Sequence, residues 1–315
     1  MNKVLITGGL GGVGYHVTRR FLEAEVPVRV LELDLPSVRK RLHSLPREPE
    51  VVWGDVTNRS DVDQALEGVD IVAHLAAVIP PRAYAEPELT LKVNVGGTRT
   101  VVEALQAAGR RIPLVFTSSI AVFGDTRDQT PPLHPDRNPM APNTAYERSK
   151  AEAEMLVRNS GLDFLVLRLG ANPPIGLSLS KFREMLIVPY DTRMEFTHVE
   201  DTATAILHAV ERFESVKNRV LIVSGGPSNQ MYYHEFIARS MAPLGLPSPP
   251  KDKFSKGPSH LDWYDTADSQ QALEFQSRTL DDYLQDLYRP IPPVVRALMR
   301  YVFGPVFGRL IVRLM

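Results

Sequence analysis

The stretch "LITGGLGGVGYHV" (residues 5–17) joins a short apolar run to a cluster of glycines and then to the start of a helical pattern. Gly8, Gly11 and Gly14 let the backbone turn sharply, approach a pyrophosphate and begin a helix whose first amides face the anion. Glycine clusters alone are common in turns, so the strand and helix patterns on either side give this one its meaning. The stretch therefore predicts the first strand, turn and helix of a dinucleotide-binding sheet.

Short apolar runs alternate with helical patterns along the first half of the chain. The runs are apolar nearly throughout, which is typical of strands buried on both faces of a parallel sheet. Repeated alternation of strand and helix predicts an α/β fold with a doubly wound parallel sheet of the Rossmann type. The expected strands are 3–7, 28–33, 50–53, 70–75, 113–118 and 164–169, and the expected helices are 12–24, 59–67, 86–109 and 144–160.

Proline-rich segments break this rhythm in the second half, around one further helix near 200–213 and one further strand at 219–225. We expect that helix and strand to return to the nucleotide-binding core of residues 1–170. The rest of 171–290 is predicted to form a smaller, irregular substrate-binding region. Residues 291–315 form a separate apolar and basic tail.

The composition is that of an ordinary soluble globular protein, with 315 residues, 43% of them hydrophobic. The formal net charge of -1 gives no electrostatic reason to expect nucleic acid as the main partner. The absence of cysteine excludes disulfides and thiol catalysis and favours a reducing compartment, so we expect a cytoplasmic protein. The start, "MNKVLITGG", lacks the pattern of a secretory signal, and the spacing of the eight histidines predicts no metal site.

Asp34 follows Gly14 at about twenty residues, where the second expected strand ends. A carboxylate there can accept hydrogen bonds from the adenosine ribose and repels a 2′-phosphate, which favours NAD over NADP. Arg39, Lys40 and Arg41 follow and could hold that phosphate, although a solvated face of a short helix explains them equally simply. We therefore expect NAD, with NADP as the alternative.

Tyr146 and Lys150, in "AYERSK" (145–150), lie one helical turn apart near the start of an expected helix. One interpretation is a solvated pair without chemistry, and the other is a phenol held beside an ammonium for proton transfer near neutral pH. Ser118 and Ser119 end the fifth expected strand, at the sheet edge where ligands bind in open α/β folds. Position therefore brings all four residues toward one edge.

Taken together, the motifs resemble the extended branch of the short-chain dehydrogenase/reductase superfamily, the NAD-dependent epimerase/dehydratase family. The resemblance covers about residues 3–225. It rests on the order and spacing of several short motifs, each of which is weak alone. These are "TGGLGGVG" (7–14), "GDVT" (54–57), "HLAA" (74–77), "NVGGT" (94–98), "SSIAVFG" (118–124), "YERSK" (146–150) and "FTHVEDTATA" (196–205).

The resemblance implies a role for each matching residue. Tyr146 would donate and accept the proton, Lys150 would bind the nicotinamide ribose and lower the tyrosine pKa, and Ser119 would hydrogen-bond the substrate oxygen. Asp55 and Val56 would contact the adenine. The implied cofactor residues are Gly8, Gly11, Gly12, Val13, Gly14, Asp34, Asp55, Val56, Leu75, Ala76, Ala77, Asn94, Tyr146 and Lys150, where Leu75, Ala76 and Ala77 line the cofactor path and Asn94 holds a helix or a water.

Two departures from the pattern bear on the reaction. Nucleotide-sugar members usually carry R-x-x-N after the sixth strand, whereas here Asn172 comes one position late and only a short segment separates it from His198. The serines at the fifth strand also lack the Asp-Glu pair of dehydratases. We therefore expect an NAD-dependent oxidoreductase of a non-nucleotide alcohol or ketone. A nucleotide-sugar epimerase is the alternative, and an NAD-binding regulatory protein without turnover is the second alternative.

Partners follow partly from the resemblance, which implies a homodimer formed through helices 86–109 and 144–160. The substrate is expected to be a small molecule, and Arg82, Arg183 and Arg193 are candidates to hold an anionic group. The tail "PPVVRALMRYVFGPVFGRLIVRLM" (292–315) is apolar with arginines and no acid. It suits peripheral contact with a membrane interface or a cover for the substrate region or a partner subunit, and proline chemistry predicts a break at Gly304–Pro305.

Overall fold

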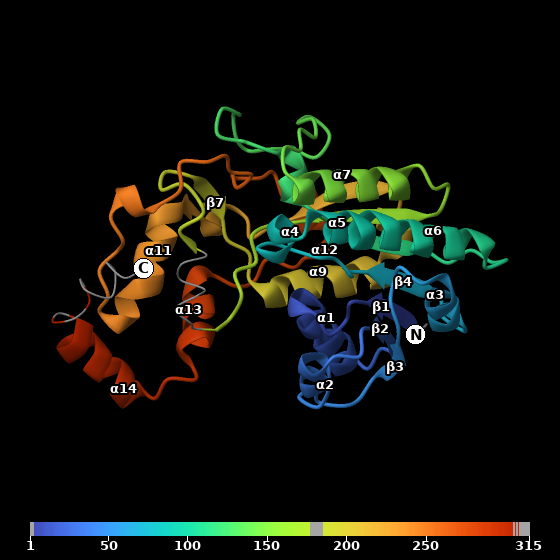
Figure 1. The fold of residues 1–315 in the computed structure, drawn as a ribbon, viewed down its shortest axis with the longest axis horizontal. Helices are drawn as coiled ribbons and strands as arrows, with labels where there is room; N and C mark the ends of the chain where they lie inside the picture. The colour runs from blue at the N-terminus through green and yellow to red at the C-terminus, as the bar shows by residue number, and fades with distance from the viewer. Residues whose placement is uncertain (1–2, 177–184, 305, 307, 309–315) are drawn as a thin grey trace.

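The computed structural model describes residues 3–176, 185–304, 306 and 308. Its centre is a seven-stranded sheet with the order β3-β2-β1-β4-β5-β6-β8, and every strand pairs in parallel with its neighbours (Figure 1). The observed strands lie within about two residues of the expected ones. They are β1 (Val4–Thr7), β2 (Val28–Glu32), β3 (Glu50–Trp53), β4 (Ile71–His74), β5 (Leu114–Ser119), β6 (Phe164–Leu169) and β8 (Arg219–Val223).

Helices cover both faces of the sheet, which confirms the doubly wound prediction. Each face has its own apolar cluster, because nearly continuous Val, Leu and Ile in the strands bury side chains on both sides. Helices α1 (Gly12–Glu23), α2 (Pro36–Leu42), α9 (Val199–Glu211), α10 (Phe213–Val216) and α12 (Ala267–Leu273) lie on one face. Helices α3 (Arg59–Leu66), α6 (Thr98–Ala107) and α7 (Ala145–Arg158) lie on the other.

The single helix expected at 86–109 is interrupted. After α4 (Arg82–Ala85) and α5 (Pro87–Leu91), the chain makes a π-helical turn, Lys92–Gly97, before α6 begins. The extra residue of a π-turn changes which side chains face inward, and such turns are frequent at functional sites. Here the turn contains Asn94, which is buried. Local sequence periodicity does not distinguish a π-turn from an α-turn.

A second lobe lies beside the sheet, at the left of Figure 1. Its core is rich in aromatic residues, with Phe196, Phe236 and Tyr283 in mutual ring contact. Its elements are β7 (Arg193–Glu195), antiparallel to β9 (Gln230–Tyr232), and α11 (Tyr233–Met241), α13 (Leu280–Tyr288) and α14 (Pro293–Leu298). This lobe is built from the proline-rich half of the sequence, while α9 and β8 from the same half belong to the sheet lobe.

The last described helix differs from expectation at Gly304. A π-helical turn, Met299–Phe303, continues α14, and Gly304 has helical dihedrals of φ -57 and ψ -51. The break predicted at Gly304–Pro305 is therefore wrong at Gly304, because this glycine has helical dihedrals. Pro305 lies outside the described residues. Among the residues that the structure describes, no helix is both long and apolar enough to cross a membrane.

The crossing of α1 over β1 depends on Gly14. A Cβ built on Gly14 would lie 2.0 Å from the carbonyl oxygen of Gly8, whereas a Cβ on Gly12 would meet nothing within 4 Å. We expect Gly14→Ala to lower the free energy of unfolding by at least about 1–3 kcal/mol through overpacking. The matched Gly12→Ala variant should change it by less than about 0.5 kcal/mol. Urea denaturation measures both, and equal losses in the two variants would contradict this explanation.

Candidate active site

The strand order reverses between β1 and β4, which makes their carboxyl ends the expected place for a ligand. The glycine-rich loop leaves β1 there and runs against the residues that follow β4. Gly8 has φ +68, and a Cβ on it would lie 2.7 Å from the Cα of Ala76. Leu75, Ala76 and Ala77 are half-buried beside this loop. The structure thus brings together two of the expected cofactor segments.

The first turn of α1 begins without a side-chain cap. Its N-cap is Gly11, no side chain caps it, and its first turn carries no acidic residue. Nothing would meet a Cβ on Gly12 within 4 Å, and Val13 is half-buried. A helix N-terminus of this kind attracts phosphate oxygens through its free N–H groups and its dipole.

The acidic residue nearest the glycine loop is Glu32, which the sequence analysis did not select. It is the last residue of β2, and its carboxylate accepts the amide of Leu10 at 3.0 Å. Burial raises its pKa, although two backbone amides partly offset this. Glu32 lies only two residues before Asp34, so the expected spacing from the glycines fits both residues. What distinguishes the two residues is where β2 ends: Glu32 is its last residue, and Asp34 lies beyond it.

Asp34 lies beyond the strand and is half-exposed. Arg39 holds it through two hydrogen bonds of 2.6 and 2.7 Å, and the hydrogen bonds from Arg39 lower the pKa of the Asp34 carboxyl. The Arg39 guanidinium also lies 4.8 Å from the ring centre of Trp53. Of the three basic residues considered for a 2′-phosphate, Arg39 is therefore paired with the carboxylate that would repel one, while Arg41 donates to the Leu10 carbonyl at 2.8 Å.

Asp55 and Val56 follow β3 at the same edge. The Asp55 carboxylate accepts the amide and the hydroxyl of Thr57, at 2.8 and 2.9 Å, so it stabilises its own turn. Val56 is buried and lies against Gly97 of the π-turn, where a Cβ would come within 3.2 Å. The Asp55 amide donates to Asp61 at 2.8 Å and its carbonyl accepts the Asn58 amide at 2.9 Å, so the backbone of this turn is also engaged within the protein.

Tyr146 and Ser119 form the polar centre of the site. Burial raises the pKa of Tyr146 to about 12, and the nearby Ser119 hydroxyl partly offsets this by lowering the pKa. Tyr146 packs against Ala83 and Ala121. Ser118 faces the other way and donates to Glu154 at 2.7 Å. Of the two serines, Ser119 therefore lies with the tyrosine and Ser118 lies in the ion-paired interior.

Lys150 is buried one turn after Tyr146, behind β5. Its ammonium donates to the carbonyl oxygen of Thr117 at 2.7 Å and lies 4.7 Å from the ring centre of Phe116. Burial lowers its pKa to about 8, with a partly compensating effect of Glu154. In this structure burial sets the direction of the Tyr146 pKa, and the Lys150 ammonium donates to Thr117. That Lys150 lowers the pKa of Tyr146 stays a prediction.

Asn94 fixes the loop after β4 to the helix that carries Tyr146. Its side-chain oxygen accepts the amide of Val78 at 2.7 Å, and its nitrogen donates to the Val78 carbonyl at 3.0 Å and to Ser149 Oγ at 2.9 Å. Ser149 in turn donates to the carbonyl of Tyr146 at 2.7 Å. Every polar atom of the Asn94 side chain is used in this way. Of the two roles expected for Asn94, the geometry matches the one that holds a helix.

A capping box sets where α7 begins. Thr144 Oγ1 accepts the amide of Glu147, and Glu147 accepts the amide of Thr144 at 2.9 Å. This arrangement satisfies helix amides that would otherwise lack partners. His260 also bonds Glu147, with 3.2 Å between Nδ1 and Oε1. The start of α7, and with it Tyr146, is therefore tied to a segment far along the chain.

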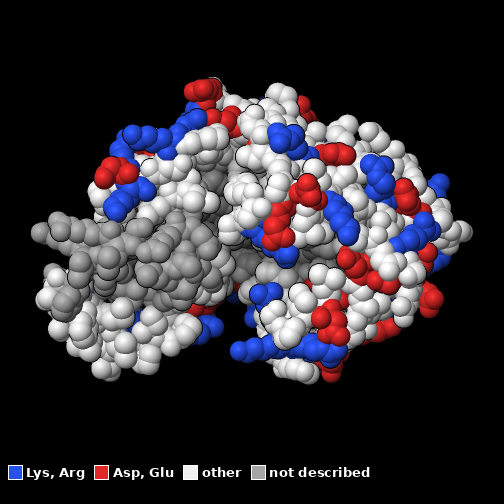
Figure 2. All heavy atoms as spheres, viewed as in Figure 1, with Lys and Arg blue, Asp and Glu red and all other residues white. Residues whose placement is uncertain are grey.

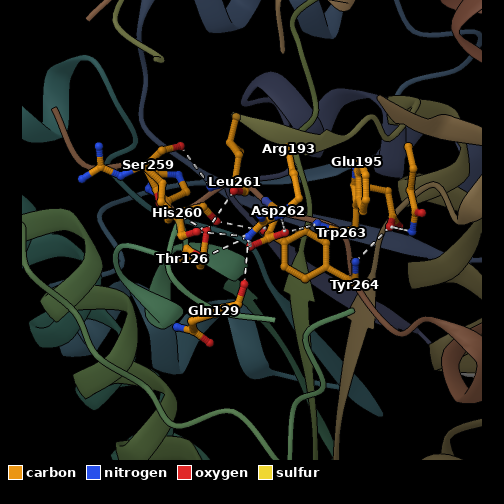
Figure 3. Close-up of polar contacts among 12 residues, drawn as sticks. Thr126, Gln129, Arg193, Glu195, Ser259, His260, Leu261, Asp262, Trp263 and Tyr264 are labelled. Atoms are coloured by element: carbon orange, nitrogen blue, oxygen red, sulfur yellow. Dashed lines mark hydrogen bonds and ion pairs between the residues drawn. The ribbon is translucent and has the colours of Figure 1, made fainter. Parts of the chain in front are cut away.

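That segment, residues 259–264, crosses between the lobes and is shown in Figure 3. Asp262 pairs with Arg193 of β7 at 2.6 Å, and the Tyr264 amide donates to Glu195 at 3.0 Å. The carbonyl of Ser259 accepts the Thr126 amide at 2.9 Å. The segment thus connects the second lobe, the loop after β5 and the start of α7 in one polar network.

The three arginines proposed to hold an anionic group differ in what the structure gives them. Arg193 is committed to Asp262 and to carbonyls of the loop after β5, as Figure 3 shows. Arg82 pairs with Glu86 at 2.8 Å. Arg183 lies outside the described residues. Asn172, one position later than the nucleotide-sugar pattern, bonds the Gly170 carbonyl at 3.0 Å and Thr202 at 2.7 Å.

No group of three or more His, Cys, Asp or Glu side chains in the described part of the chain could hold a metal ion. His74, at the end of β4, is instead a neutral link in the interior. Its Nδ1 lies 2.6 Å from Thr7 Oγ1 and its Nε2 lies 3.0 Å from Thr98 Oγ1. Burial, together with nearby Lys150, lowers the pKa of His74 to about 3.

Comparison with known proteins places these features in a family. The model of the NAD dependent epimerase/dehydratase family matches residues 4–172. The chain is 36% identical over 165 residues to the 3 beta-hydroxysteroid dehydrogenase type 7 of Rattus norvegicus, which covers 49% of this chain and 47% of that protein. It is 33% identical to the D-erythronate dehydrogenase of Cupriavidus necator, over 53% of this chain and 54% of that protein. The match thus spans about half the length of these relatives.

Solved structures share the fold over nearly the whole chain. A UDP-glucose-4-epimerase from Stenotrophomonas maltophila, with bound NAD and formylated UDP-arabinopyranose, aligns with a TM-score of 0.76 at 20% identity, over 95% of this chain and 99% of that one. A UDP-glucuronic acid 4-epimerase from Bacillus cereus, in complex with UDP-glucuronic acid and NAD, aligns with a TM-score of 0.77 at 19% identity, over 91% and 98% of the two chains.

The neutral, buried state of His74 predicts a pH-dependent stability. With a folded pKa of about 3 and an ordinary unfolded pKa near 6.5, the unfolded chain binds more protons between these values. The contribution of His74 is therefore complete above about pH 6.5 and is lost as the pH falls toward 3, by about 1.4 kcal/mol per pH unit.

Urea denaturation between pH 4.5 and 7 measures this dependence. The wild-type slope should fall in His74→Gln, whatever the absolute stability of that variant. His43→Gln, at an exposed histidine, should keep the wild-type slope. If His74→Gln and the wild type lose stability in parallel on acidification, His74 is not the group responsible.

Proposed function

The chain belongs to the NAD dependent epimerase/dehydratase family, and on that premise we propose that it is an NAD-dependent oxidoreductase of a non-nucleotide alcohol or ketone. The observation that carries the proposal is that Ser119 lies beside Tyr146, with Lys150 one turn later, at the carboxyl edge of the sheet that also carries the glycine-rich loop. This is the set of groups that hydride transfer to or from a carbon–oxygen bond requires.

The residues around the loop fit a dinucleotide. The free amides of Gly12 and Val13 would hold the pyrophosphate, and Glu32 and Asp34 would accept the ribose hydroxyls. Asp55, Val56 and the Leu75–Ala77 segment would border the adenine and the path of the cofactor, and Lys150 would donate to the nicotinamide ribose. Bound NAD supplies the acceptor or donor of the hydride. NAD is favoured over NADP because two carboxylates lie at this position and Arg39 is neutralised by Asp34.

Tyr146 moves the proton at the substrate oxygen in this proposal, and Ser119 Oγ hydrogen-bonds the same oxygen. With its pKa raised to about 12, the phenol holds its proton at neutral pH, which suits donation to a carbonyl. In the opposite direction the phenol must first lose that proton. The Lys150 ammonium, buried on the same helix, donates one of its three N–H groups to the Thr117 carbonyl, and its positive charge would stabilise the phenolate.

Two features support a non-nucleotide substrate: the contacts of Asn172 after β6, and the exposed aromatic residue on the segment that follows β4. Asn172 is engaged by Gly170 and Thr202 and does not project as a free amide. Tyr84, on the segment that follows β4, is an exposed aromatic residue near Tyr146. The two curated relatives named above act, by their names, on a hydroxysteroid and on a sugar acid, neither of which is a nucleotide sugar.

Nucleotide-sugar epimerisation is the alternative, because the two solved epimerases share the fold over nearly the whole chain. The second alternative, NAD binding without turnover, is disfavoured by the intact Ser119, Tyr146 and Lys150. We further propose a cytoplasmic homodimer that pairs the outer faces of α6 and α7. Those faces line a shared surface cavity bordered by Val102, Gln106, Met155 and Asn159.

Replacing Tyr146 by Phe separates catalysis from cofactor binding. We expect Tyr146→Phe to lower turnover by about 10²- to 10⁴-fold, because one oxygen carries the proton transfer. The increase of the unfolding midpoint on adding NAD should remain. NADH absorbance, with hydroxysteroids, sugar acids and simple secondary alcohols as a substrate panel, provides the assay. Tyr301→Phe, at an exposed tyrosine, is the matched control. Full activity in Tyr146→Phe would refute the assignment.

Thermal unfolding discriminates the substrate classes without knowledge of the substrate. NAD at about 100 times its Kd should stabilise the folded protein by about 2.7 kcal/mol, and NADP should give a smaller shift. UDP, dTDP, GDP and CDP are then added to the NAD-saturated protein. We expect no further increase of the midpoint. A clear increase with one nucleoside diphosphate would reject the non-nucleotide substrate in favour of the epimerase alternative.

A further inference from the structure

The last described helix packs on the second lobe along a narrow line. It comprises α14 and the π-helical turn Met299–Phe303, at the lower left of Figure 1. Met299 packs against the apolar core of that lobe, and Gly304 and Gly308 are buried. A Cβ on Gly304 would lie 2.5 Å from the carbonyl oxygen of Gly245, so the two backbones touch without side chains between them.

The π-helical turn decides which residues face away from the lobe. It adds one residue to the turn, so Met299, Gly304 and Gly308 come to one side although their spacing is five and then four. Val294, Leu298, Val302 and Val306, each four residues apart, are exposed. We call these four residues and Tyr301 the C-terminal apolar face.

This face is far more exposed than apolar residues of a folded monomer usually are. The exposed fractions are 80% for Val294, 46% for Leu298, 71% for Tyr301, 50% for Val302 and 67% for Val306. In Figure 2 the lower left of the molecule, where α14 lies, is mostly white, whereas the sheet lobe is dotted with both charges. A contiguous apolar surface of this kind marks an interaction site.

The charges next to the face have one sign. Arg300 is exposed and Arg296 half-buried, and among the described residues neither makes an ion pair with an acidic group. The sequence contains no Asp or Glu after Asp286, while arginines continue to Arg313. A second copy packed on the same face would oppose arginine to arginine. Lipid phosphates would instead pair with these arginines. The positive charge therefore favours an anionic lipid surface over a second copy of the chain.

We propose that the C-terminal apolar face binds an anionic lipid surface, with the helix lying in the plane of the interface. Its valines, Leu298 and Tyr301 enter the boundary between headgroups and acyl chains, and Arg300 contacts phosphate. The glycine contact between Gly304 and Gly245 holds the second lobe against that surface. This inference stands independently of the proposed reaction, since it uses no residue of the candidate active site.

Co-sedimentation of the full chain with vesicles tests the inference. Vesicles of phosphatidylcholine with 30% phosphatidylglycerol are compared with vesicles of phosphatidylcholine alone, at about 0.05 and 0.5 M salt. We expect binding to the anionic vesicles that weakens in high salt. Leu298→Asp should weaken it by more than tenfold, and Arg300→Gln by about fivefold, the factor expected for one basic residue near an anionic surface.

Matched controls use equally exposed sites on the sheet lobe. Leu91→Asp and Arg59→Gln should bind vesicles as the wild type does, and circular dichroism should show all variants folded. Binding that is unchanged in Leu298→Asp, or no binding to anionic vesicles, overturns the inference. So does sedimentation velocity showing that Leu298→Asp only dissociates a dimer, because the face would then hold a second copy.

Discussion

Glu154 of α7 and Arg168 of β6 form an ion pair of 2.7 Å, and both side chains are almost completely buried. Removing one partner of such a pair strands the other charge in the interior, which typically costs about 3–5 kcal/mol. The same carboxylate accepts Ser118, and Arg168 stacks on Phe123. The pair therefore fixes α7, β5 and β6 relative to one another. The ion pair thereby helps to position Lys150, which lies one turn before Glu154 on α7. It also helps to position Ser119, which follows Ser118 on β5.

Burial is the main electrostatic influence around the candidate site. It raises the pKa of Tyr146 to about 12, lowers that of Lys150 to about 8 and lowers that of His74 to about 3. In each case the dry environment disfavours the charged form of the group. For Tyr146, the nearby Ser119 hydroxyl partly offsets the effect of burial by lowering the pKa. The pKa of Tyr146 therefore depends more on burial and on the Ser119 hydroxyl than on the one-turn spacing between Tyr146 and Lys150.

The two lobes are joined by side chains that neither lobe could position alone. The 259–264 segment links β7 to the start of α7 through Asp262 and His260. At the other side, Asp201 of α9 accepts the amides of Ser277 and Arg278. These contacts hold the second lobe against the sheet.

Sequence alone determined the elements whose signals are local. The buried strands, the glycine loop and the helical spacing of Tyr146 and Lys150 follow from periodicity and residue type within a few positions. The family resemblance already selected Ser119 over Ser118, whereas tertiary structure alone decided which carboxylate reaches the glycine loop, Glu32 or Asp34. It also directed Lys150 to Thr117 and exposed one side of the last helix through a π-turn. Those outcomes depend on contacts between residues far apart in the chain, and local periodicity carries no information about such contacts.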